Sequence, residues 1–246
     1  LVVIKLLIKI LKIPTRMAYL ISIGSTVCGT TAIMATAPII KANKNEISYA
    51  IANITLFGIL SMLIYPYFAN FYFEGESLFI GLFLGTSIHE TSQVAAAGLI
   101  YDQQFDSPET LNIATVTKLI RNTFLIVMIP LFAFLYNRVN TKEGSYSIIN
   151  IFPYFVLGFV GMIIFRNIGD QVFIINNNDN WIETISFVKS SSKVFLTMAM
   201  AAIGLSTNLK DIRNMGYKPF LVGFIAMLTV GIVCIISIEI YQRIFI

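Results

Sequence analysis

The sequence predicts an all-α integral membrane protein: a polytopic helical bundle with inverted repeats and two broken or re-entrant helical elements. Three observations predict this class. First, 57% of the 246 residues are hydrophobic and only 12% are charged, whereas soluble domains carry about 25% charged residues. Second, several apolar runs approach the roughly 20 residues that a helix needs to cross a bilayer. Third, the polar segment 24–40 nearly recurs as segment 85–101.

The composition also excludes several classes of protein. The formal net charge is +4, but the basic residues stand at the ends of apolar runs, where orientation signals occur, so no nucleic-acid partner is expected. Cys28 and Cys234 lie within apolar segments, which argues against a disulfide framework. One histidine, His89, and scattered acids form no zinc-ligand pattern. Nucleotide-binding loops and nucleophile elbows are absent from the sequence, so we expect no metal, no cofactor and no enzyme.

The apolar runs and their breakers predict the elements in order. Residues 1–11 are expected to be the tail of a helix that Pro14 ends, with upstream helices missing from an N-terminally truncated chain. Further spans are predicted at residues 17–40, 48–68, 77–101, 112–136, 148–168, 186–207 and 217–241, with a loop over 167–183. We expect a single transmembrane transporter domain over 1–246, with repeat elements 17–68 and 77–136.

The two polar segments, 24–40 and 85–101, share small and hydroxyl-bearing residues at equivalent positions. Identical pairs occur sixty-one residues apart: Gly24/Gly85, Thr30/Thr91, Ala35/Ala96 and Ile39/Ile100. Small, hydroxyl-rich sequence interrupted by glycine predicts, within a bilayer, a broken helix whose freed backbone groups face a cavity. Two such copies predict an internally repeated transporter with its site where the copies meet.

The distribution of lysine and arginine predicts the orientation of the repeats. Segments 1–16, 41–47, 137–147 and 208–218 contain basic residues, whereas 69–76, 102–111 and 169–185 contain acids and no lysine or arginine. If each repeat element is a re-entrant hairpin, every basic loop falls inside, and the two modules have the opposite orientations of an inverted repeat. We favour this interpretation over broken helices that cross fully, although each element is long enough to cross.

His89 and Glu90 are ionisable residues within the second repeat element, where the first has Cys28 and Gly29. A charged group at membrane depth costs about 2.5–3.5 kcal/mol on insertion scales and normally faces a cavity or a partner. We interpret both as proton-coupling residues, because Glu90 can exchange a proton and histidine titrates near neutral pH. The alternative is a structural ion pair that holds the element in place.

Lys118 and Arg121 lie on one face of the following helix, because they are three residues apart. Arginine presents a planar fork to oxyanions, which predicts an anion contact. Pairing with Glu90 and extension toward the membrane interface are the alternatives. Segment 198–209 ends in small and polar residues and predicts either another broken helix at the same cavity, with Asn208 as a contact, or close helix packing.

The predicted substrate-binding residues are neutral hydroxyl and amide donors together with two cations. They are Ser25, Thr26, Thr30, Thr31, Ser87, Thr91, Ser92, Gln93, Lys118, Arg121 and Asn208. With half-helix N-termini adding their dipoles, they predict a secondary transporter of a small anion, coupled to H+ or Na+. A sodium-coupled organic-anion carrier is the main alternative. A membrane enzyme using His89 and Glu90, and a membrane protein without transport activity, are further alternatives. The expected partners are the anion, the coupling ion and the lipid bilayer, and formation of a homo-oligomer stays open.

Four motifs resemble the YeiH-type bacterial membrane proteins, a family described as candidate sulfate exporters. They are residues 28–38 (CGTTAIMATAP), 85–98 (GTSIHETSQVAAAG), 117–122 (TKLIRN) and 203–209 (IGLSTNL). The resemblance covers essentially the whole chain in order. Thr31 and Glu90 stand where the family usually has serine and aspartate, and both changes keep the chemistry. The resemblance implies a multi-pass protein of the bacterial plasma membrane, further helices before this chain, and sulfate as a candidate substrate.

Overall fold

The structure is a computed structural model, and it describes residues 13–125, 127–129, 131–132, 154–174, 179–206 and 217–245. The described residues form helices and turns with no strand among them, so the all-α prediction is confirmed for this part of the chain. They divide into two compact units, residues 1–152 with 209–246 and residues 153–208. The prediction of a single transporter domain over the whole chain stays a prediction.

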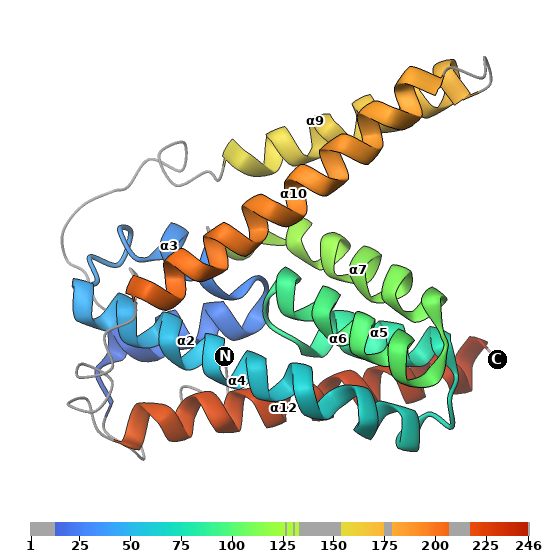
Figure 1. The fold of residues 1–246 in the computed structure, drawn as a ribbon. Helices are drawn as coiled ribbons and strands as arrows, with labels where there is room; N and C mark the ends of the chain where they lie inside the picture. The colour runs from blue at the N-terminus through green and yellow to red at the C-terminus, as the bar shows by residue number, and fades with distance from the viewer. Residues whose placement is uncertain are drawn as a thin grey trace. The chain divides into compact units, whose positions relative to one another are not determined.

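Among its described residues, the first unit has two pairs of short helices, α2–α3 and α5–α6, and the longer helices α4, α7 and α12 (Figure 1). In chain order these are α2 (Thr15–Thr26), α3 (Gly29–Thr36), α4 (Lys44–Tyr72), α5 (Ser77–Ser87), α6 (Thr91–Phe105), α7 (Pro108–Thr123) and α12 (Tyr217–Phe245). The predicted elements 17–40 and 77–101 are therefore both broken, and α4 and α12 cover the predicted spans 48–68 and 217–241. The predicted span 112–136 begins within α7 and runs beyond the described residues.

The α2–α3 pair reverses direction at its break. A Cβ placed on Gly24 would lie only 2.9 Å from Cδ1 of Ile33, nine residues later. In one continuous helix these residues would be about 13.5 Å apart, at a rise of about 1.5 Å per residue. The two half-helices therefore run antiparallel, side by side, and form a hairpin.

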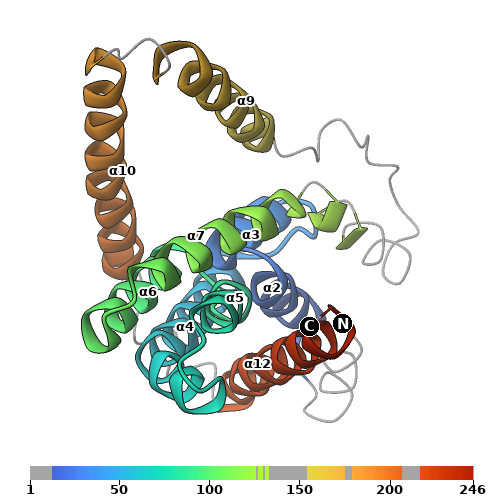
Figure 2. The same cartoon turned by 90° about the vertical axis from the view of Figure 1, so that its right-hand side faces the viewer.

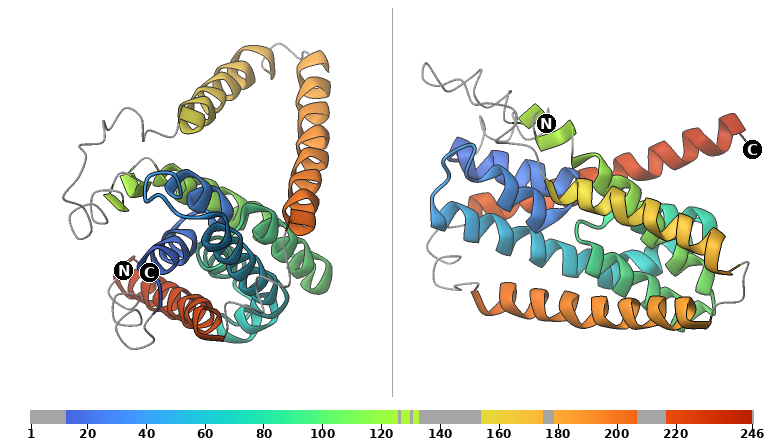
Figure 3. Two further views of the ribbon diagram at one scale, coloured as in Figure 1. Left: turned by 90° about the vertical axis from the view of Figure 1, so that its left-hand side faces the viewer. Right: turned by 90° about the horizontal axis from the view of Figure 1, so that it is seen from above.

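The α5–α6 pair also reverses, as its contacts with α7 establish. Along α5, Gly81 abuts Ile113 and Gly85 abuts Thr117, so α5 runs parallel to α7. Along α6, Gly98 abuts Leu111, whereas the first residue of the helix, Thr91, accepts a hydrogen bond from Asn122 (3.2 Å), so α6 runs antiparallel to α7. The two hairpins occupy opposite ends of the unit along α4 (Figures 1 and 3). The chain thus reverses at both breaks, and re-entry of the two hairpins into a membrane stays a prediction.

Helices α4 and α12 form the long framework of this unit. A capping box begins α4, because Asn43 accepts from the amide of Glu46 and Glu46 accepts from the amide of Asn43, each at 2.8 Å. Helix α12 packs beside α2, α4 and α5 (Figure 2). Residues Lys44–Tyr72 and Phe220–Ile244 are long and apolar enough to cross a membrane, judged by length and composition.

Charged residues separate between the two ends of this unit. Lys41 and Lys44 stand at the α3–α4 turn, and Lys218 stands at the start of α12. Acidic residues stand at the α4–α5 and α6–α7 turns: Glu74, Glu76, Asp106 and Glu109. These two turns are neighbours, since the hydroxyls of Ser77 and Ser107 are 2.8 Å apart. Arg243, in the last turn of α12, and Glu46, in the first turn of α4, depart from this pattern. The predicted division into basic and acidic loops therefore follows the fold.

The second unit consists of α9 (Tyr154–Gly169), a π-helical turn (Asp170–Ile174) and α10 (Asp179–Ser206). Helical turns replace much of the loop predicted over 167–183. Arg166 and Trp181 both donate to the carboxylate of Asp170, and these bonds connect the facing helix ends. Helix α10 runs unbroken to Ser206, so no break occurs in the described part of segment 198–209, and Asn208 lies outside the described residues.

Candidate functional site

The two helix breaks meet at the side chain of Lys118. Helix α2 ends at Thr26 and helix α5 at Ser87, and each leaves carbonyl oxygens without partners in its own helix. The Lys118 Nζ donates to the carbonyl of Val27 (3.1 Å) and to that of Ile88 (2.7 Å). One side chain from α7 therefore connects both hairpin tips, and it is fully buried, with 0% of its surface exposed.

Arg121, one helical turn later, makes the same kind of connection with more donors. Its Nη2 donates to the carbonyls of Ser25 (2.9 Å) and Thr26 (2.7 Å), and its Nε donates to Thr26 (3.1 Å). Its Nη1 donates to the carbonyl of Thr86 and to that of Ile88 (3.4 Å). Cations at helix C-termini are stabilised by the helix dipole. Both basic side chains thus cap the C-terminal ends of α2 and α5.

These contacts bear on the three interpretations of the two cations. Extension of Lys118 toward the interface is wrong, because its ammonium group lies buried between the breaks. Neither cation donates a hydrogen bond to Glu90 among the described residues, because both direct their donors to main-chain carbonyls. Lys118 and Glu90 still interact electrostatically, so pairing of their charges stays an alternative. The predicted anion contact stays a prediction, and an anion would have to share or displace donors that the carbonyls already use.

Glu90 connects the tips a second time, through the beginning of α3. Its Oε1 accepts from the amide of Thr30 (3.0 Å) and from the Thr30 hydroxyl. The side chain is 6% exposed. A Cβ on Gly29 would lie 2.8 Å from both Cγ and Oε1 of Glu90, so glycine at this position leaves the space that the carboxylate occupies. A carboxylate at a helix N-terminus is stabilised by the amides and the dipole there.

The predicted hydroxyl donors fall into two groups. Ser25, Thr26 and Ser87 donate to the carbonyls of the residues four positions earlier, so their hydrogens serve their own helices. The other hydroxyl residues stand at the N-terminal ends of α3 and α6. Thr31 is exposed, and Thr30, Thr91 and Ser92 are half-buried. We call these four residues the polar surface of the tips.

His89 and Gln93 are buried beside this surface. Neither ring nitrogen of His89, which is 0% exposed, has a hydrogen-bond partner among the described residues. The Gln93 Nε2 donates to the carbonyl of Thr55 on α4 (3.2 Å), and Gly58 leaves room for its amide. Gln93 thus packs against α4, while its Oε1 is without a partner in the described part of the chain.

Sequence reasoning missed Gly29 as a site residue, and it missed Asn122. Asn122 donates to the Thr91 hydroxyl, and its Oδ1 has no partner among the described residues. The available signal was its position directly after Arg121 in the motif 117–122. Across the residues that the structure describes, no three His, Cys, Asp or Glu side chains gather as a metal site.

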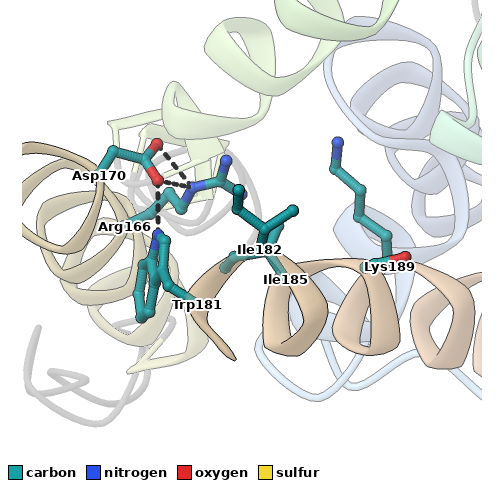
Figure 4. A pocket seen from close by; sticks show the side chains of 7 residues that line it. Arg166, Asp170, Trp181, Ile182, Ile185 and Lys189 are labelled. Atoms are coloured by element: carbon teal, nitrogen blue, oxygen red, sulfur yellow. Dashed lines mark hydrogen bonds and ion pairs between the residues drawn. The ribbon is translucent and has the colours of Figure 1, made fainter. Parts of the chain in front are cut away.

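The second unit contains a separate shallow hollow of about 310 Å³ (Figure 4). Arg166 donates through Nε to both oxygens of Asp170 (2.8 and 2.7 Å), and the Trp181 indole donates to the same carboxylate (2.9 Å). Lys189, Ser186 and two isoleucines complete the lining. The ion pair is solvent-accessible, with 41% and 33% of its side chains exposed, so it is a surface connection between helix ends rather than a buried site.

Comparison with known proteins places the chain among membrane proteins. The family described as "Conserved hypothetical protein 698" matches residues 1–223. The chain is 36% identical over 245 residues to a UPF0324 membrane protein of Fusobacterium nucleatum, covering 96% of this chain and 69% of the relative. It is 37% identical over 226 residues to one of Streptococcus agalactiae, covering 92% and 65%, and 33% identical over 243 residues to one of Clostridium tetani, covering 93% and 66%.

The chain therefore spans about two thirds of the length of these relatives. No solved structure matches it. The matched region includes every residue of the hairpin tips described above, from Ser25 to Asn122. The chain belongs to the UPF0324 membrane protein family, which is the family of the YeiH-type proteins that its four motifs resemble.

Proposed function

We propose that this chain forms the core of an ion-coupled secondary transporter for a small anion, with sulfate as the first candidate. The observation that carries the proposal is the meeting of two oppositely directed hairpins at Lys118 and Arg121. Inverted repeats with broken helices place transporter sites near the middle of the membrane, at the interface of the repeats. Under this proposal α2–α3–α4 and α5–α6–α7 are the two inverted repeats of a polytopic bundle.

The charge of the tips favours an anion. Two cations, Lys118 and Arg121, lie beside one carboxylate, Glu90, and the N-terminal ends of α3 and α6 add partial positive charge. Both cations donate their hydrogen bonds to main-chain carbonyls. The anion would accordingly be held by amides and hydroxyls of the helix N-termini, such as those of Thr31 and Ser92, within the positive potential of the cations.

The separation of basic and acidic turns supports a multi-pass arrangement in the bacterial plasma membrane. Basic loops face the cytoplasm in membrane proteins, so the α3–α4 turn and the start of α12 would lie inside and the α4–α5 and α6–α7 turns outside. The α2–α3 hairpin would then enter from the cytoplasm and the α5–α6 hairpin from outside. A carrier of this design exchanges access without covalent chemistry, so we propose a transporter rather than an enzyme.

A sodium-coupled organic-anion carrier is the second candidate, and one observation favours it. Two buried amide oxygens, Oε1 of Gln93 and Oδ1 of Asn122, have no partner among the described residues. Amide oxygens and unwound carbonyls are suitable ligands for a hard cation such as Na+. The second candidate requires sodium and an organic anion, whereas the first transports sulfate with H+ or Na+, so flux measured under each ion gradient in one reconstituted system can distinguish them.

The test is radiolabelled sulfate flux in proteoliposomes of the full-length protein, driven separately by a pH gradient and by a sodium gradient. Thr31→Val removes an exposed tip hydroxyl, and Thr184→Val removes an exposed hydroxyl of α10 as the matched control. We expect gradient-driven flux that Thr31→Val reduces by about tenfold, the effect of losing one hydrogen bond to an anion, and that Thr184→Val leaves unchanged. Flux no greater than in empty liposomes would remove sulfate, and equal flux in both variants would remove the tips as the site.

A further inference from the structure

We infer that Glu90 and the transported anion compete for the N-terminus of α3, and that a proton bound to Glu90 releases this N-terminus to the anion. The inference rests on the proposed function and states how its proton would be coupled. Two observations carry it: the Glu90 carboxylate occupies donors suited to an anion, and the equivalent position of the other hairpin is the glycine that makes room for it.

The donors that Glu90 occupies are those that an oxyanion would use. A helix N-terminus binds anions through its first free amides and adjacent hydroxyls. The amide and the hydroxyl of Thr30, at the second position of α3, both donate to the Oε1 of Glu90. The carboxylate comes from the opposite hairpin, sixty residues away along the chain. It therefore acts as an internal anion that closes the α3 N-terminus and holds the two tips together.

The two hairpins are unequal at this point. Gly29 and Glu90 are equivalent positions of the sequence repeat, and they lie in contact, because a Cβ on Gly29 would be 2.8 Å from the Glu90 side chain. The first hairpin consequently offers no second carboxylate to the N-terminus of α6. One carboxylate serves one helix end, which predicts one coupled proton for each anion.

Protonation changes both the hydrogen bonds and the charge of the tips. The proton adds to the Glu90 carboxylate, Thr30 loses its charged acceptor, and an anion can accept from the same amide and hydroxyl. Lys118 on α7 interacts electrostatically with Glu90, and it also interacts with Arg121 on α7, Cys28 at the start of α3 and Cys234 on α12. His89, which precedes Glu90 in the chain, interacts with the same two cations. Neutralising the single carboxylate in this surrounding raises the positive potential, so proton and anion favour each other's binding.

The first experiment measures this contact without any substrate. Amide hydrogen exchange of segment 24–36 is followed in the full-length protein in lipid nanodiscs, at neutral and at acidic pH, with labelling times matched for intrinsic exchange. We expect faster exchange at acidic pH in the wild type, and no pH dependence in Glu90→Gln. Glu90→Asp, which keeps a carboxylate, should restore the dependence. Equal exchange of the wild type at both pH values would overturn the inference.

The second experiment adds sulfate and measures binding by calorimetry over the same pH range. As the pH rises over this range, the sulfate affinity of the wild type should weaken, by up to about tenfold per pH unit, as coupling to one proton requires. In Glu90→Gln it should be independent of pH. Sulfate binding that keeps its pH dependence in Glu90→Gln overturns the inference and leaves the transporter intact. Absence of sulfate binding overturns the substrate, and the exchange experiment then decides the inference by itself.

Gly29→Ala provides an independent variant that keeps Glu90. The added methyl group would meet Glu90 Cγ and Oε1 at 2.8 Å, so the carboxylate should leave Thr30 at every pH. Exchange of segment 24–36 should therefore be fast and independent of pH, while exchange of a reference peptide from α12 stays as in the wild type. Retained pH dependence in a folded Gly29→Ala protein would contradict the assigned contact.

Discussion

The two hairpins share a backbone plan and differ in their chemistry. Helix α2 ends at Thr26 and helix α5 ends at Ser87, sixty-one residues apart, and α7 contacts the tips of both hairpins. At the break, the first hairpin has Cys28 and Gly29 and the second has His89 and Glu90. The repeated backbone creates two sets of free helix ends, and the unequal residues add a carboxylate, that of Glu90, which connects the second hairpin to the first.

The largest expected effect follows from removing the ammonium group of Lys118, which donates to one carbonyl of each hairpin. In Lys118→Met, the carbonyls of Val27 and Ile88 both lose a charged donor. A buried hydrogen bond to a charged group contributes about 1.5–3 kcal/mol, so we expect a loss of about 3 kcal/mol or more. The measurement is the folded fraction of detergent-solubilised protein by size-exclusion chromatography, followed by thermal unfolding.

Lys44→Met is the matched control, because Lys44 is exposed at the first position of α4. It should elute and unfold like the wild type. A Lys118→Met protein as stable as this control would show that the hairpin tips do not depend on the buried ammonium group.

The contrast between the hairpins also marks what sequence reasoning can reach. The positions of both breaks follow from the local repeat, because glycine and hydroxyl residues interrupt each apolar run at equivalent places. The role of Lys118 does not follow, because its acceptors are 91 and 30 residues away in the chain. Spacing on a helix gives the face of a side chain, while its acceptors depend on tertiary packing.

The same limit applies to Glu90 and to the loop between α9 and α10. Sequence reasoning interpreted Glu90 as a proton-coupling residue, with an ion pair as the alternative. The contact of its carboxylate with the amide of Thr30, sixty residues earlier, follows from neither interpretation. The polar composition of 167–183 predicts a loop, but side-chain bonds to Asp170 stabilise helical turns at both edges. Local composition reports solvent exposure in this segment better than it reports backbone conformation.

The aligned glycines Gly24 and Gly85 provide the second comparison. A Cβ on Gly85 would lie 2.5 Å from the carbonyl oxygen of Ala114, a backbone atom that cannot move alone. A Cβ on Gly24 would meet the flexible end of Ile33 at 2.9 Å. Overpacking costs about 1–3 kcal/mol, so Gly85→Ala should lie at the upper end and Gly24→Ala near the lower end.

Thermal unfolding of the two alanine variants, measured side by side, tests this order. The melting temperature of Gly85→Ala should fall further than that of Gly24→Ala. If Gly24→Ala were the more damaging change, the first hairpin would have to be packed more tightly than its contacts indicate.

A smaller and symmetric effect is expected from the serines that end the first half-helices. Ser25 donates to the carbonyl of Ile21 (2.8 Å) and Ser87 to that of Phe83 (2.6 Å). Each alanine variant should lose about 0.5–1.5 kcal/mol, the net value of one hydrogen bond. Because these hydrogens serve the helices themselves, sulfate affinity should change less than in Thr31→Val. Calorimetric titration of Ser25→Ala and Ser87→Ala measures this, and a large loss of affinity in either would restore that serine as a direct ligand.

The smallest expected effect concerns Asp170 in the second unit. It distinguishes the acid response of this residue from that of Glu90 in the hairpins. Hydrogen bonds from Trp181 and then Arg166 hold the pKa of the exposed Asp170 carboxyl below its usual value of 3.8. A carboxyl with a lowered pKa in the folded state contributes stability above its unfolded pKa and loses that contribution as pH falls through the folded value. The response of Asp170 should therefore appear below about pH 3.8, the usual pKa of an aspartate carboxyl.

Fluorescence of Trp181, the single tryptophan of this chain, can follow that response. Asp170→Asn should remove the acid transition of the Trp181 signal, which is obtained as the difference between each protein and its Trp181→Phe counterpart. The same variant should leave the pH dependence of exchange in segment 24–36 unchanged, because that dependence belongs to Glu90 in the other unit. If Asp170→Asn altered both signals, acid would act on the hairpins through the second unit, and the difference between Gly29 and Glu90 would no longer account for the proton response.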